Sequence, residues 1–182
     1  MLKNLMPLGS VLLVAACSTN PLKQQSANYQ LHVTYHTAVN ELPLPRMETN
    51  TIIDVNTINL KPSSPNSNSV QTLGGFDYAV KCNEAKSQCW HSHVYPTLEY
   101  RVLDQGDSSL LVKGQFISQA GREIVSNDSG SYVKLTIDKD VPVWIEGTEV
   151  IPFSLSTDSF EPLQLEAPTG NKITLRIDKI EH

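Results

Sequence analysis

Residue types that can form a covalent cross-link or bind a metal are concentrated at Cys82, Cys89, His91 and His93. Six residues separate the two cysteines, a loop that the tip of a β-hairpin can form. In an oxidising compartment, two thiols joined by so short a loop form a disulfide. Closing the loop contributes about 2.5 kcal/mol in the chain-entropy description. We therefore expect a bond between Cys82 and Cys89.

A metal site is the alternative interpretation of the same window. His91 and His93 are two residues apart, so on a strand both imidazoles leave the same face. With two thiolates they would offer four ligands to Zn²⁺ or a copper ion. His32 and His36 alternate in the same way and could bring further imidazoles nearby. This alternative requires that the two thiols stay reduced, and we expect no metal cofactor.

The two tryptophans are candidates for a protein interface. Trp90 follows the constrained loop directly, so its indole either packs on the disulfide or is displayed to a partner. Trp144 alternates with Val143 and Ile145 and thus faces the opposite side of an expected strand. Aromatic side chains are enriched at the centres of interfaces. Trp90 and Trp144 are therefore the residues that we expect at a binding surface.

The N-terminal residues end in Val14, Ala15, Ala16 and Cys17, after a basic Lys3 and a short apolar stretch. That stretch is too short to span a bilayer as a helix but suits a secretory signal. The segment resembles the signal of bacterial lipoproteins, whose lipobox has a branched residue, two small residues and cysteine. The resemblance implies removal of residues 1–16 and lipidation of Cys17. An ordinary signal peptide cut near Ala16 is the alternative.

The residues after the lipobox indicate where such a lipoprotein would reside. Ser18 stands where an aspartate retains lipoproteins in the inner membrane, so the resemblance implies a lipid anchor in the outer membrane, facing the periplasm. Residues 17–28 are largely polar and have no periodicity, which predicts a flexible tether. The formal net charge of the whole chain is −5, so no basic field attracts nucleic acid.

The pattern changes abruptly at Tyr29, from which Leu31, Val33 and Tyr35 alternate with polar residues. Similar short alternating runs continue to the C-terminus with turn residues between them, including one over 141–145. No window carries the apolar period of a three-turn helix. We therefore predict a single all-β domain over 29–182, an antiparallel β-sandwich or small barrel.

Several catalytic motifs are absent from the chain. It contains no Gly-x-Ser-x-Gly elbow, no His-Glu-x-x-His and no glycine-rich phosphate loop. Carboxylates such as Asp104, Asp107 and Asp128 occur at turns, where hydrogen bonds to the local backbone explain them. We therefore predict that the protein is not an enzyme.

Two segments resemble known envelope proteins. Residues 129–132 (Ser-Gly-Ser-Tyr) with 144–147 (Trp-Ile-Glu-Gly) are similar to a stretch in membrane-bound inhibitors of C-type lysozyme, although Glu146 stands where those have lysine. Residues 121–142 look like hairpins of secretin-associated periplasmic proteins, which stabilise secretion or pilus assemblies by adding sheet edges. The second resemblance favours an accessory lipoprotein with an envelope protein as its partner. An inhibitor of a peptidoglycan-active enzyme and a metal-binding lipoprotein are the alternatives.

Overall fold

A computed structural model describes residues 28–41, 52–64, 66–128 and 131–180. Within these ranges the chain forms eleven strands and no helix. Accordingly, the described residues include no helix with the length and hydrophobicity needed to cross a bilayer. The predicted signal peptide (1–16) and the tether, apart from Asn28, lie outside the described residues.

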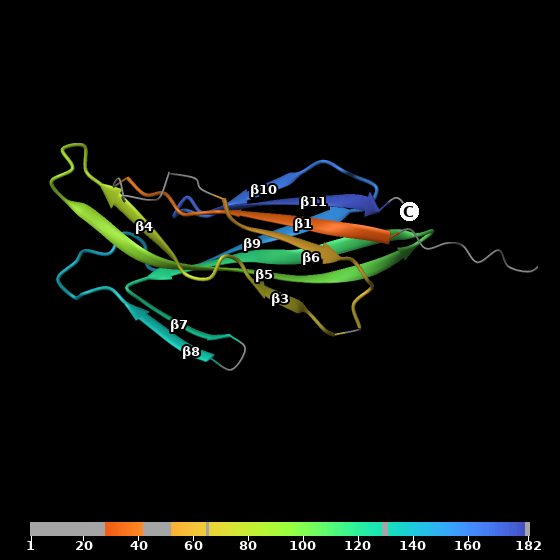
Figure 1. Cartoon of the computed structure of the whole chain (residues 1–182), viewed down its shortest axis with the longest axis horizontal. Coiled ribbons are helices and arrows are strands. Elements are labelled where there is room, and N and C mark those ends of the chain that lie inside the picture. Colours follow the sequence, from red (N-terminus) through yellow and green to blue (C-terminus); the bar gives the residue numbers. More distant parts are fainter. Residues whose placement is uncertain (1–27, 42–51, 65, 129–130, 181–182) are drawn as a thin grey trace, which may run out of the picture.

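The strands form two main antiparallel sheets, called here sheet A and sheet B (Figure 1). Sheet A consists, in spatial order, of β10 (Leu163–Glu166), β11 (Lys172–Ile180), β1 (Asn28–His36) and β2 (Ile52–Asn59). Sheet B consists of β3 (Ser69–Thr72), β5 (Cys89–Gly106), β6 (Ser109–Gly121) and β9 (Gly147–Ser156), with β4 (Asp77–Cys82) paired to the first part of β5. A separate ribbon of β7 (Glu123–Asp128) and β8 (Ser131–Thr136) lies on the outer side of sheet B (Figure 1).

This architecture confirms the prediction of a single-domain antiparallel β-sandwich. The sheets do not close on themselves, so the small-barrel alternative is wrong. The chain passes from one sheet to the other at both edges, from β2 to β3 and from β9 to β10. At the first crossing, the backbone N–H of Ser63 donates to the carbonyl of Val102 over 2.8 Å. The crossings keep the two sheets face to face.

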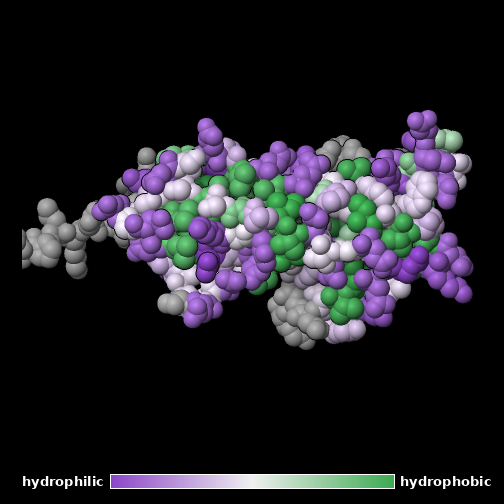
Figure 2. All heavy atoms as spheres, turned by 180° about the vertical axis from the view of Figure 1, so that it is seen from behind, coloured by the Kyte–Doolittle hydropathy of each residue, from purple (hydrophilic) through white to green (hydrophobic). Residues whose placement is uncertain are grey.

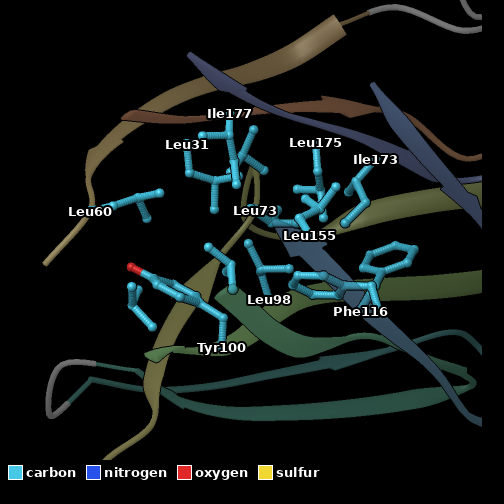
Figure 3. Packing of buried hydrophobic residues seen from close by; sticks show 14 of the residues in the cluster. Leu31, Leu60, Leu73, Leu98, Tyr100, Phe116, Leu155, Ile173, Leu175 and Ile177 are labelled. Atoms are coloured by element: carbon cyan, nitrogen blue, oxygen red, sulfur yellow. The ribbon is translucent and has the colours of Figure 1, made fainter. Parts of the chain in front are cut away.

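The main hydrophobic core fills the space between the sheets. Leu31 and Ile177 of sheet A point toward Leu98 and Phe116 of sheet B (Figure 3). The predicted alternation of β1 is confirmed, because Leu31, Val33 and Tyr35 are all buried. Seen from behind, the hydrophobic patches on the surface are separated by hydrophilic residues (Figure 2).

The start of β1 and the β4–β5 turn lie at opposite ends of the domain. Asn28 is paired with Ile180, so β1 begins at the end where β11 finishes. The turn between β4 and β5 lies at the opposite end of the long axis (Figure 1). A tether that precedes Asn28 is therefore attached far from that turn.

A buried carboxylate joins the two sheets near the β4–β5 end. The Tyr35 hydroxyl on β1 donates to Asp77 Oδ2 over 2.9 Å, and the backbone N–H of Ala38 donates to the same oxygen. The N–H of Tyr78 donates to Asp77 Oδ1 over 2.7 Å. Burial and then the negative charge of Asp77 raise the pKa of Tyr35 far above its usual range. The phenol therefore stays protonated and serves as a donor.

Replacing Tyr35 with phenylalanine should lower the free energy of unfolding by about 1–3 kcal/mol, because the buried carboxylate of Asp77 loses a donor. Tyr100→Phe is the matched control, since the Tyr100 hydroxyl has no hydrogen-bond partner within the described part of the chain. Its removal should change stability by about 0.5 kcal/mol or less. Urea denaturation of both variants measures the difference, and equal losses would contradict the role assigned to the Tyr35–Asp77 bond.

Candidate functional site

The β4–β5 turn is closed by a disulfide between Cys82 and Cys89, as predicted. The two residues are directly opposite in the antiparallel pair, with Cα atoms 4.0 Å apart. Hydrogen bonds inside the loop stabilise it, because the Asn83 Oδ1 atom accepts from the backbone N–H groups of Ser87 and Gln88. Since the two sulfurs are bonded to each other, the alternative of four ligands with two thiolates is wrong.

His91 and His93 lie on the outer face of sheet B, and the ring of Tyr78 on β4 contacts both imidazoles; we call these three residues the tyrosine–histidine cluster. Tyr78 is directly opposite His93 in the β4–β5 register. Its ring centroid is 5.5 Å from the centroid of each imidazole. The Tyr78 hydroxyl lies 2.7 Å from His91 Nδ1, within hydrogen-bond distance. The cluster thus brings two imidazoles and a phenol together.

The environment of the cluster alters the protonation of two of its members. The backbone of Thr136 at the end of β8 lies near His93 and can accept a hydrogen bond from its charged form. Burial lowers the pKa of His93 from its ordinary value of 6.5, and this effect outweighs the hydrogen bond, which acts in the other direction. Burial also raises the pKa of Tyr78. Both groups therefore favour their neutral forms.

Trp144 lies on the opposite, inner side of sheet B, in a segment expected to be a strand. The segment instead forms a single parallel bridge, between Val143 and His91, beyond the last β5–β6 pair. The Ser92 hydroxyl fixes it by donating to the Ile145 carbonyl over 2.8 Å and accepting from the Ile145 N–H over 2.9 Å. The indole of Trp144 packs against a small core cluster of Ala38, Ala79, Val94 and Ala120.

Both tryptophans are half-buried. Lys81 Nζ lies 5.4 Å from the ring centroid of Trp144, a cation–π geometry. Trp90 is directly opposite Lys81 in the β4–β5 pair. Trp144 therefore closes the inner face of the sheet near the disulfide end, and the role of either indole at an interface stays a prediction.

The β7–β8 ribbon packs one face against sheet B and exposes the other. Ile124 is fully buried, and the Ser126 hydroxyl donates to the Tyr95 hydroxyl over 2.7 Å. At the base of the ribbon the Arg122 guanidinium donates to the carbonyls of Asp138 and Val141. Tyr132 is 65 % exposed on the ribbon, although large apolar groups usually bury more of their surface. The local sequence pattern did not predict this role of Arg122 at the base of the ribbon.

A second polar arrangement, which the sequence did not reveal, lies on the outer face of sheet A. His32 Nδ1 is 3.2 Å from the Thr57 hydroxyl, and its Nε2 is 3.3 Å from Asp178 Oδ2. In a nucleophilic relay, Nε2 faces the hydroxyl and Nδ1 faces the carboxylate, which is the reverse. Arg176 also binds Asp178, over 2.6 Å. We interpret the group as cross-strand polar pairing.

The structure separates the histidines that the sequence grouped together. His32 and His36 belong to β1 in sheet A, whereas His91 and His93 belong to sheet B, so the expectation of further imidazoles beside the pair is wrong. In the described ranges, no three residues of His, Cys, Asp or Glu are grouped so that they could hold a metal. Cys17 lies outside the described residues.

No family model, curated protein or solved structure matches this chain. The geometry of the molecule is therefore the basis for the functional proposals that follow.

Acidification should destabilise the protein in part through His93. Because the folded pKa is lowered, the unfolded chain binds the proton first as the pH falls below 6.5, and stability declines until the folded pKa is passed. Above that window the ring is neutral in both states and contributes no penalty. His93→Gln should therefore lose less unfolding free energy than the wild type between about pH 7.5 and 5. Urea denaturation at both pH values measures this, and an equal or steeper loss in the variant would refute it.

Proposed function

We propose that this protein is a non-enzymatic lipoprotein, anchored in the outer membrane by a lipid on Cys17 and facing the periplasm. It acts as an accessory component of an envelope assembly of the secretion or pilus type, and it binds a protein of that assembly. The observation that carries the proposal is the β7–β8 ribbon, which exposes Tyr132 and Val125 on its outer face and whose strands pair with no third strand in the described part of the chain.

The ribbon has the chemistry of a docking surface for an extended segment. On the outer face of the ribbon, Val125 is 38 % exposed beside the more exposed Tyr132, and the same face carries the ion pair of Glu123 and Lys134. A two-stranded ribbon with open edges can accept a further strand, whose main-chain hydrogen bonds provide affinity while side chains provide specificity. Such an edge is otherwise a site of unwanted pairing, which proteins usually block with charge or proline. We infer that the partner contributes a strand of a sheet protein.

The fold supports an anchor at the N-terminus. β1 begins at the end of the domain remote from the β4–β5 turn, and the ribbon lies in the half of the molecule toward that turn (Figure 1). Several acyl chains, at about 0.8 kcal/mol for each buried methylene, hold a protein at a membrane durably. A lipid on Cys17 would therefore leave the ribbon accessible from the periplasm.

The anchor is tested by Cys17→Ser in the producing bacterium. The variant should incorporate no labelled palmitate and should move from the outer-membrane fraction to the soluble fraction, because the acyl chains supply the attachment. Ser18→Asp is the matched control, which keeps the lipid and should move the protein to the inner membrane. A wild-type chain that takes up no palmitate, or a serine variant that stays in the outer membrane, would overturn the anchor.

The docking surface is tested with a photo-crosslinking residue in place of Tyr132 in the full chain, in intact cells. We expect an adduct with one envelope protein, and no adduct when the probe replaces the exposed Lys179 of sheet A. Tyr132→Ser should reduce co-purification of that same protein about tenfold or more, since exposed tyrosines at interfaces contribute on the order of 2 kcal/mol.

Recovery of the monomer alone from both probe positions would count against the accessory role. Inhibition of C-type lysozyme by the purified full chain would instead favour the alternative of an inhibitor. Unchanged co-purification of the partner in Tyr132→Ser would place the interface elsewhere.

A further inference from the structure

We propose that His91 and His93 bind a divalent transition-metal ion of the Cu²⁺ type on the outer face of sheet B. The proposal does not depend on the anchor or on the docking partner, since it rests on the tyrosine–histidine cluster alone. The ion is held by one nitrogen from each imidazole, and water completes its coordination.

The backbone brings the two imidazoles within reach of one ion. Side chains two apart on a strand leave the same face and start about 6.6 Å apart. Both rings also contact Tyr78, since each ring centroid is 5.5 Å from the phenol centroid. His91 and His93 are each half-buried, so the site is accessible to an ion from solvent. Their common face and their short separation along β5 place both rings within reach of one ion.

Each imidazole also has an outer partner of the kind that orients metal ligands. His91 Nδ1 lies 2.7 Å from the Tyr78 hydroxyl, whose oxygen can accept a hydrogen bond from the Nδ1–H and so leave Nε2 with a lone pair. For His93, the nearby backbone of Thr136 is the acceptor that could orient the ring. A histidine that binds a metal usually donates its second N–H to such a group, which fixes the tautomer and the ring orientation. One nitrogen of each ring remains for the ion.

The donor set favours copper over the other common ions. The cysteines of the same window are joined in a disulfide, so no thiolate is present to select Zn²⁺ or Cu⁺. Structural zinc sites use four protein ligands, whereas the described cluster offers two imidazoles. Mg²⁺ and Ca²⁺ require oxygen donors. Among divalent ions of the first transition row, Cu²⁺ binds nitrogen most strongly and accepts a tetragonal shell with water.

The test is a Cu²⁺ titration of the full chain at neutral pH, followed by electron paramagnetic resonance. A Cys17→Ser background removes the remaining thiol, which would reduce the ion. We expect one bound Cu²⁺ per chain with hyperfine structure from two imidazole nitrogens. His91→Gln and His93→Gln should each weaken binding tenfold or more. Tyr78→Phe should weaken it less, since both ligands remain and only the orientation of His91 is lost.

His32→Gln is the matched control, because His32 is also a strand histidine with polar partners but belongs to sheet A. It should bind Cu²⁺ as the parent chain does. Equal affinity in the parent, His91→Gln and His93→Gln chains would overturn the proposal, as would a loss of binding in His32→Gln.

A measurement without variants keeps the proposal testable if the glutamine substitutions prevent folding. Substoichiometric Cu²⁺ broadens the proton resonances of the imidazoles nearest to it. Selective broadening of the His91 and His93 rings supports the site. Earlier broadening of any other histidine refutes it.

Discussion

The carboxylate of Asp77 is almost fully buried between the two sheets, where a charge is tolerated only if hydrogen bonds replace its water. Tyr35 and the N–H of Ala38 supply two of these bonds from the side of sheet A, and the N–H of Tyr78 supplies a third from β4. One side chain therefore fixes how the sheets meet near the disulfide end. Because its third donor is the backbone of Tyr78, the same carboxylate also holds the residue whose side chain completes the tyrosine–histidine cluster on the other face.

Strand β5 serves both faces of sheet B through the period of two in its side chains. Ser92 and Val94 point inward, where they fix the segment of Trp144 and fill the small core cluster. His91, His93 and Tyr95 point outward, toward Tyr78 and the β7–β8 ribbon. A shift of one residue in register would exchange these two sets, exposing apolar groups and burying imidazoles. The packing of the core thus determines that the two histidines face outward.

The local sequence pattern was sufficient to predict the features that depend on residues close together in the chain. The alternation from Tyr29 to Tyr35 specified which face of β1 is buried, and the short spacing of Cys82 and Cys89 specified the disulfide. The pairing of β1 with β11 could not be predicted, because alternating strands carry no local signal of which distant strand completes them. Residues 141–145 alternate as a strand does, yet they form no regular ladder. Their hydrogen bonds go mainly to His91 and Ser92, in the part of β5 that β6 does not reach. The partners of His93 and Asp77 likewise come from distant parts of the chain.

The disulfide and the tyrosine–histidine cluster belong to the same β4–β5 hairpin, so the register that the disulfide holds also positions the cluster. Cys82 is held opposite Cys89 at the turn end of the β4–β5 pair, and the same register places Tyr78 opposite His93 further from the turn. A covalent bond at that end excludes slippage of one strand past the other, which would move the phenol away from one or both imidazoles. At the other end of the pair, Asp77 fixes β4 by its bonds to sheet A. Tyr78 is therefore constrained from both directions along its strand, which explains how its phenol keeps a defined position beside the two histidines.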